Sequence, residues 1–365
     1  MNNRMRIINT VLMKDIDRQP FTFFFGPWME TLENWRNQGL PENADWDEEI
    51  DFDPGIRVIH VDLGYCPSFK YELIEERETT RIIRDERGVL QEIRKKGSSI
   101  PNFIDYPVKN RDSWAELKKT RLNPENPKRF PDNWKQLADE YNNGDHAIQI
   151  GVYPYGLFGT LREMMGVEML LTSFYDNPDL IYEMMEYLTT FWLKIYEKVC
   201  KTVKIDIIHM WEDMSGKSGS LISPKMVREF MMPQYKRIKE FADKNKIPVF
   251  SLDTDGNCEE LVPLFIECGI NLIFPFEVAA GSDIVEYRRK YPELCIMGGI
   301  DKREISKGKQ ALEKELARAE SMFNGPGYIP SIDHLFPPEV TYEDFKNFSK
   351  AIKQKIDKYA TMQSP

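Results

Sequence analysis

Two aspartates separated by a single threonine follow a short apolar run, in the segment Asp253-Thr-Asp-Gly-Asn257. Side chains two residues apart on a strand point the same way, so both carboxylates can reach one ion. A second polar loop, after another apolar run, carries His334. Oxygen donors with one imidazole suit Zn²⁺ or another divalent metal. We therefore predict Asp253, Asp255 and His334 as metal ligands.

Each of these residues also has a simpler interpretation. Asp255, followed by Gly256-Asn257, is typical of a helix N-cap and a turn. A single histidine such as His334 is commonly a packed, hydrogen-bonded residue. Both aspartates at one strand end, together with a histidine on an irregular loop, favour a site over these alternatives.

Carboxylates follow most of the other apolar runs as well. Like charges crowded at one place repel each other, so a metal ion or a cationic substrate is needed to compensate them. We expect Glu212 or Asp213 to be a fourth metal ligand or a general acid, and Asp62 to serve in acid/base chemistry. The residues expected to bind substrate are Trp28, Tyr153, Tyr155, Arg162, Trp211, Glu277 and Asp301.

The elements that must position these residues alternate in type. Short β-type runs are separated by turns and amphipathic helical stretches, a pattern typical of βαβ units and a parallel sheet. The predicted strands are Phe21–Phe25, Arg57–Leu63, Ala147–Val152, Ile205–Trp211, Pro248–Leu252, Asn271–Pro275, Leu294–Gly298 and Tyr328–Ile332.

Eight such strands predict an α/β fold of the (β/α)8 TIM-barrel type, whose chemistry lies at the C-terminal ends of the strands. A helix over Met5–Lys14 precedes the first strand. After the second strand, residues 72–131 read as an insertion that contains a small β-meander. We predict a single domain over residues 1–365.

Composition restricts the function further. The chain has 49 Lys and Arg against 59 Asp and Glu, a net charge of −10, which argues against a nucleic-acid partner. The five cysteines are odd in number and lack CxxC spacing, so neither disulfides nor a thiolate zinc site is expected. Without a signal peptide or an apolar membrane span, the expected location is the cytoplasm. Dinucleotide, P-loop and nucleophile-elbow motifs are absent.

From Arg4 to Tyr359 the chain resembles the uroporphyrinogen decarboxylase superfamily, which includes the cobalamin-dependent methyltransferases of the methylcobalamin:coenzyme M type. The segments that carry the resemblance are Asp17-Arg-Gln-Pro20, Leu161-Arg-Glu-Met-Met-Gly166, Leu221-Ile-Ser-Pro-Lys225, Asp253-Thr-Asp-Gly-Asn257, Gly298-Gly-Ile-Asp301 and Asp333-His334. The resemblance implies a (β/α)8 barrel, in agreement with the strand count.

The chain departs from both branches of this superfamily. Decarboxylases carry an Arg-rich segment after the first strand, where this chain reads Phe25-Gly-Pro-Trp-Met-Glu30. Asp62 is similar in position to the central Asp of the decarboxylases. The methyltransferases bind zinc with a His-x-Cys motif and a later Cys, and here Asp253, Asp255 and His334 stand near those places. Without thiolates the metal would be more Lewis-acidic, which suits an ether or hydroxyl oxygen.

The leading hypothesis is a metal-dependent, corrinoid-linked methyltransferase that acts on a small methylated substrate, such as a methoxylated compound. The corrinoid is expected on a separate partner protein that docks at the barrel mouth, and a homodimer is the default assembly. The alternative is a cofactor-free decarboxylase of a porphyrin-like or other acid, with Asp62, Tyr155 and His334 in acid/base roles. A binding barrel without activity is the third hypothesis.

Overall fold

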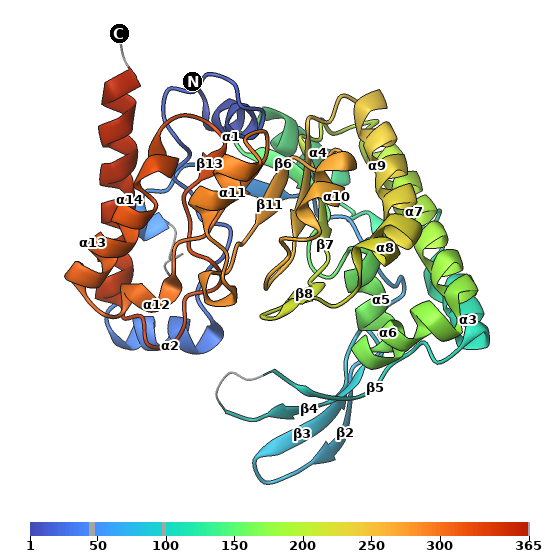
Figure 1. The fold of residues 1–365 in the computed structure, drawn as a ribbon. Helices are drawn as coiled ribbons and strands as arrows, with labels where there is room; N and C mark the ends of the chain where they lie inside the picture. The colour runs from blue at the N-terminus through green and yellow to red at the C-terminus, as the bar shows by residue number, and fades with distance from the viewer. Residues whose placement is uncertain (44–47, 97–99, 364–365) are drawn as a thin grey trace.

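The computed structural model describes residues 1–43, 48–96 and 100–363. Within them, a curled sheet of parallel strands forms the centre of the molecule, and its strand order follows the chain (Figure 1). Its seven strands are β1 (Ile56–Val58), β6 (Ala147–Ile150), β7 (Ile207–Trp211), β10 (Val249–Asp253), β11 (Leu272–Phe274), β12 (Cys295–Met297) and β13 (Tyr328–Ile329).

Helices follow the strands and cover the outer face of the sheet. The helices are α1 (Asn3–Val11), α2 (Met29–Asn37), α3 (Arg111–Arg121), α4 (Trp134–Asn143), α5 (Leu157–Met165), α6 (Val167–Asp176), α7 (Pro178–Val199), α8 (Pro224–Met226), α9 (Met232–Lys244), α10 (Val262–Glu267), α11 (Ile284–Lys290), α12 (Lys302–Ile305), α13 (Lys309–Arg318) and α14 (Tyr342–Gln363). Between α8 and α9 the chain forms a π-helical turn, Val227–Met231, and Pro233 lies in the first turn of α9.

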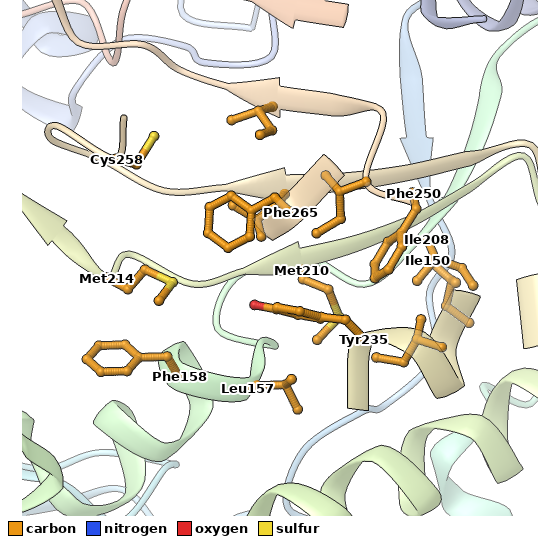
Figure 2. Close-up of a cluster of buried hydrophobic side chains, with 14 of the residues drawn as sticks. Ile150, Leu157, Phe158, Ile208, Met210, Met214, Tyr235, Phe250, Cys258 and Phe265 are labelled. Atoms are coloured by element: carbon orange, nitrogen blue, oxygen red, sulfur yellow. The ribbon is translucent and has the colours of Figure 1, made fainter. Parts of the chain in front are cut away.

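Apolar side chains fill both faces of the curled sheet. On the outer face, Met210 of β7 and Phe250 of β10 pack against Leu157 of α5 and Tyr235 of α9 (Figure 2). On the inner face, alternate residues of the strands meet Ile7 and Val11 of α1. Helix α1 therefore closes one end of the curled sheet and leaves the C-terminal ends of the strands at the other end, which we call the mouth (Figure 1).

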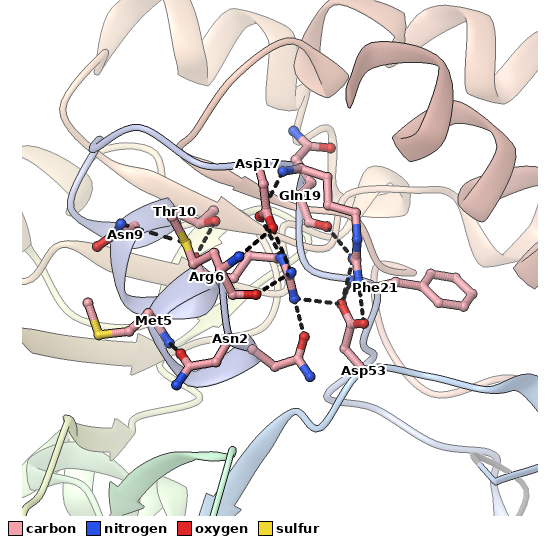
Figure 3. A network of polar contacts seen from close by, with 12 residues as sticks. Asn2, Met5, Arg6, Asn9, Thr10, Asp17, Gln19, Phe21 and Asp53 are labelled. Atoms are coloured by element: carbon pink, nitrogen blue, oxygen red, sulfur yellow. Dashed lines mark hydrogen bonds and ion pairs between the residues drawn. The ribbon is translucent and has the colours of Figure 1, made fainter. Parts of the chain in front are cut away.

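The predicted first strand, Phe21–Phe25, is wrong: this segment is extended but forms no ladder with β1. Its Phe21 N–H donates to the Asp53 carboxylate at 2.9 Å, and Asp53 N–H donates to the Phe21 carbonyl. Arg18 and Arg6 engage the same carboxylate in an ionic network (Figure 3). These contacts with Asp53 hold the segment at Phe21 without a strand ladder.

In the described residues the parallel sheet therefore has seven strands, and hydrogen bonds do not close it into an eight-stranded barrel. On its other side the extended segment meets the chain after β13, through a parallel bridge between Pro27 and Phe336. On the β1 side a cavity of 770 Å³ remains, lined by Thr22, Phe24 and Gly55 among others. The α/β class of the prediction is confirmed, with this correction to the barrel.

A second sheet projects from the mouth end of the molecule (Figure 1). It is antiparallel, with the order β2 (Glu72–Glu76), β3 (Thr80–Arg84), β4 (Leu90–Arg94) and β5 (Asn102–Asp105). It occupies the region for which a meander is predicted, although residues 97–99 of that region lie outside the described residues. A short hairpin, β8 (Ser215–Gly216) and β9 (Gly219–Ser220), also lies at the mouth.

No helix in the described part of the chain has the length and apolar character needed to cross a membrane.

Candidate active site

The mouth is built around the paired ends of β7 and β10. Asp253, the last residue of β10, pairs in parallel register with Trp211, the last residue of β7. Two residues earlier the same register pairs Ser251 with His209, whose ring stacks on Phe274 in the barrel interior. Because side chains alternate along a strand, Asp253 also points inward, one layer above this pair and at the open end. The Trp211 ring lies against Gly159 of α5.

The structure brings three more carboxylates to this end of the barrel, each with a partner. Asp213 forms an ion pair with Arg162, which also donates to the Asp213 carbonyl at 2.7 Å. Glu277 is 3.3 Å from Lys302 Nζ and accepts a hydrogen bond from Gly256 N–H at 2.9 Å. The third carboxylate, Asp255, faces His334.

His334 and Asp255 meet across the mouth, since one follows β13 and the other follows β10. His334 Nε2 lies 3.5 Å from Asp255 Oδ2. The imidazole stacks on Phe25 with a centroid distance of 5.1 Å, and Trp28 lies beside it at 6.4 Å. The ring is therefore held by aromatic packing on one side and by a carboxylate on the other.

Burial and mutual repulsion change the acidity of the cluster. Only 6% of Asp253 is exposed, and burial together with the nearby Asp255, Asp213 and Glu277 raises the pKa of Asp253 well above its ordinary value. Burial also raises the pKa of Asp213, while the Arg162 guanidinium opposes that rise. Asp213 has a positive φ of 40°, a conformation that Asp tolerates better than most residues, and this turn directs Asp213 and the preceding Glu212 to different partners.

Glu212, predicted as a metal ligand or general acid, is fully buried beneath the mouth. Its carboxylate accepts backbone hydrogen bonds from Leu157, Phe158 and Gly159 at 2.6 to 3.2 Å, all at the N-terminus of α5. The Tyr235 hydroxyl donates to the same carboxylate at 2.6 Å. Burial raises the pKa of Glu212 to about 7. These contacts assign Glu212 to holding α5 against β7, because its oxygens are taken up by the protein.

Asp301, predicted to bind substrate, is also engaged by its own surroundings. Its side chain caps α12 by accepting from Arg303 N–H at 2.9 Å, and it forms an ion pair with the Arg303 guanidinium. Asp333, which follows β13, accepts hydrogen bonds from Val278 N–H and Lys302 N–H. These two carboxylates hold loops at the mouth in place.

Asp62 and Tyr155 line a different cavity, of 260 Å³, on the side of the mouth next to the projecting sheet. Asp62 accepts from Gly64 N–H at 2.8 Å and lies 3.6 Å from Arg129. Burial raises the pKa of the Tyr155 hydroxyl to about 12. His334 does not line this cavity, so the structure keeps the predicted acid/base trio in two places.

Sequence reasoning missed two residues of this second cavity, Arg87 and Glu163. Arg87 comes from the turn between β3 and β4, forms an ion pair with Glu163 of α5, and lies 2.5 Å from the Tyr153 hydroxyl. Tyr153 in turn packs edge-on against Trp211, with centroids 4.6 Å apart. Only the contact between the projecting sheet and the barrel reveals Arg87, since its sequence context is an ordinary turn.

The predicted metal ligands fit a divalent ion in type but not in arrangement. Among the described residues, no three His, Cys, Asp or Glu side chains form a group that could hold a metal ion. Asp255 and His334 face each other, whereas Asp253 is buried among carboxylates that raise its pKa. We therefore route no chemical step through a metal, and metal binding stays a prediction.

The parallel sheet with its outer helices, and the charged and aromatic mouth at its strand ends, define a TIM-barrel-like α/β protein. The sequence model of the family described as uroporphyrinogen decarboxylase (URO-D) matches residues 89–355, nearly three quarters of the chain. The chain belongs to this family.

Known structures agree with the fold. A methyltransferase from Methanosarcina mazei superposes with a TM-score of 0.62 over 97% of this chain and 99% of its own, at 14% sequence identity. That level of identity speaks for a shared fold. No curated protein sequence matches the chain significantly. The family model therefore shows the family of the chain, and the structural neighbour shows its fold.

Proposed function

We propose that this protein is a methyltransferase that moves a methyl group between a small methylated compound and a corrinoid carried by a separate protein. The observation that carries the proposal is the contact of His334 with Asp255 across the mouth, beside the inward-facing Asp253. It joins a proton-transferring group to an open, charged surface where a substrate and a docked partner have access.

The chain's own residues supply the proton chemistry. When a methyl group leaves an ether oxygen, the C–O bond breaks and the oxygen takes up a proton to become a hydroxyl. His334 Nε2 faces Asp255 at 3.5 Å, so in the protonated ring Asp255 stabilises the positive charge and the N–H of Nδ1 is the one that gives the proton to the substrate oxygen. The partner's corrinoid supplies the methyl-accepting group.

Aromatic side chains complete the pocket. Trp28 is 37% exposed beside the imidazole, and Tyr153 is 50% exposed on the opposite side, next to Trp211. Rings on both sides of the mouth can hold an apolar substrate body against His334 and keep bulk water from the reacting oxygen. Arg162 is occupied by Asp213 and orients that loop.

Zn²⁺ or another divalent metal remains part of the proposal as an additional ion at Asp253, Asp255 and His334. The oxygen and imidazole donors are of the kind such an ion takes. In the described residues the three do not converge, so the proton chemistry above is assigned to His334 and Asp255 alone.

The test is methylation of free cob(I)alamin, which replaces the protein-bound corrinoid, by methoxylated compounds in the presence of the purified protein. The absorbance change that accompanies loss of cob(I)alamin gives the rate. We expect turnover with the wild type and at least a tenfold loss in His334→Gln. A rate equal to that without protein across a panel of methyl donors would refute the proposal.

The cavity next to the projecting sheet supports a second candidate, cofactor-free decarboxylation of a porphyrin-like or other acid. Asp62 and Tyr155 line the same 260 Å³ space, and Arg87 supplies a cation there. Release of CO₂ from uroporphyrinogen, lost in Asp62→Asn, would favour this function over methyl transfer.

A further inference from the structure

The cavity next to the projecting sheet has a buried apolar wall. Four side chains form this wall, namely Leu63, Leu122, Met164 and Leu188. The cavity measures 260 Å³, a little below the roughly 300 Å³ at which pockets for drug-sized ligands begin. A space of this size and lining therefore fits a molecule with a single ring better than a long chain or a large molecule.

Two tyrosines bring hydroxyl groups to the same cavity. Tyr65 lines it, and within the described residues the buried Tyr65 hydroxyl has no hydrogen-bond partner. Tyr155 lines it as well, and Gly64 leaves room for the Tyr155 hydroxyl, since a Cβ at Gly64 would lie 2.8 Å from that oxygen. Burial raises the pKa of both hydroxyls above the usual value for tyrosine, so both keep their protons at neutral pH. The Tyr65 O–H is therefore a buried donor that calls for an acceptor.

The charged side chains of the lining do not call for a charged ligand. Arg87 forms an ion pair with Glu163, and Asp62 lies 3.6 Å from Arg129. Glu86, the remaining charged residue of the lining, is exposed to water. An anionic ligand would have to compete with Glu163 for Arg87, and a cationic ligand would have to compete with Arg129 for Asp62. A neutral ligand disturbs neither ion pair.

We propose that this cavity binds a small neutral aromatic compound that carries a carbonyl or ether oxygen. The ring packs against the leucine and methionine side chains, and the oxygen accepts a hydrogen bond from the Tyr65 hydroxyl. The lining combines Arg87 of the turn between β3 and β4 with Met164 of α5 and Leu188 of α7, so the ligand contacts the projecting sheet and the barrel together. This site goes beyond the proposed methyl transfer, and His334 does not line it.

The experiment measures the binding of three small probes by isothermal titration calorimetry. Acetophenone has the ring and a carbonyl oxygen, ethylbenzene has a similar shape without an acceptor, and benzoate carries a negative charge. We expect acetophenone to bind the wild type at least fivefold more tightly than ethylbenzene, which is about the fold-change that one neutral hydrogen bond supplies. Benzoate should bind more weakly than acetophenone, because the cation of Arg87 is already paired.

Tyr65→Phe removes the hydroxyl and keeps the ring. This variant should bind ethylbenzene at least as tightly as the wild type does, and it should lose the preference for acetophenone. Tyr175→Phe is the matched control, because it makes the same chemical change at a tyrosine that is 76% exposed. It should bind all three probes like the wild type. If Tyr65→Phe fails to fold, as judged by circular dichroism, Leu188→Phe fills the cavity instead and should abolish binding of both neutral probes.

Three results would overturn the inference. The first is equal binding of acetophenone and ethylbenzene by the wild type, or a preference that survives in Tyr65→Phe. The second is binding of neither neutral probe, as expected if water alone occupies the cavity. The third is tightest binding of benzoate, which would indicate the carboxylate ligand that the second candidate function requires. None of these results depends on methylation of cob(I)alamin, so the site and the proposed methyl transfer succeed or fail separately.

Discussion

Glu212 can show whether burial or hydrogen bonding controls the ionisation of a carboxyl group beneath the mouth. Three backbone N–H groups and the Tyr235 hydroxyl surround its carboxylate, and these donors favour the ionised form. Complete burial opposes ionisation more strongly, and it raises the pKa of Glu212 to about 7 from the usual 4.5. We predict that the free energy of unfolding depends on pH through this group.

The sign follows from the direction of the shift. A carboxyl whose pKa is raised on folding contributes stability that is fully present below the unfolded-state pKa and is lost as the pH rises through the folded-state pKa. For Glu212 the window runs from about 4.5 to about 7. A pKa difference of this size lowers the free energy of unfolding of the wild type by about 2.5 kcal/mol between pH 5 and pH 8.

The perturbation is Glu212→Gln, which has the same shape and no ionisable group. The amide NH₂ must face at least one backbone N–H of α5, and leaving that buried donor unpaired costs about 2 kcal/mol. We expect the variant to be less stable than the wild type by about 1 kcal/mol at pH 5, and the order to reverse at pH 8 because only the wild type loses stability on ionisation.

Urea denaturation followed by tryptophan fluorescence at pH 5 to 8 gives both free energies. Asp51→Asn, the same acid-to-amide change on the surface, should track the wild type at every pH. A gap between Glu212→Gln and the wild type that stays constant, or that widens as the pH rises, would refute the reasoning. It would mean that the donors at the start of α5 outweigh burial.

Three other predictions concern the mouth and its supports. Elemental analysis should find about one divalent metal per chain in the wild type if the predicted site binds one, with loss in Asp255→Ala and His334→Ala; wild type that stays metal-free after incubation with zinc would end the metal hypothesis. Gly156→Ala should lower the free energy of unfolding by more than about 3 kcal/mol, because a Cβ there would lie 1.8 Å from the Trp211 carbonyl oxygen; a melting temperature like that of the wild type would contradict this close approach. Arg87→Ala should increase amide hydrogen exchange in β3 and β4, because the arginine joins the turn between them to α5; unchanged exchange would show that the ion pair does not hold the projecting sheet.

Hydrophobic periodicity was enough to predict most of the architecture. Runs such as 147–152 and 205–211 became β6 and β7, because a strand covered on both faces needs a continuous apolar run. The exception, Phe21–Phe25, has the same composition and still forms no ladder. The N–H of Phe21 donates instead to the side chain of Asp53, more than two dozen residues away, and local sequence does not predict such a contact.

The candidate site divides in the same way. Asp255 and His334 each follow a predicted strand, and this was enough to predict that both lie at the mouth, because parallel strands end at one edge. The same rule could not separate Glu212 from Asp213, which are neighbours in the chain. A positive φ at Asp213 sends one carboxylate to the N-terminus of α5 and the other to Arg162.

The sequence by itself therefore determined the α/β class, the alternation of strands and helices, and the end of the barrel that collects the charges. These features depend on periodicity and chain direction, which are local properties. Only the tertiary structure decided which carboxylates of the mouth the protein itself pairs, as it pairs Asp213 with Arg162 and Glu277 with Lys302. That distinction depends on burial and on donors from distant segments, and folding alone brings them together.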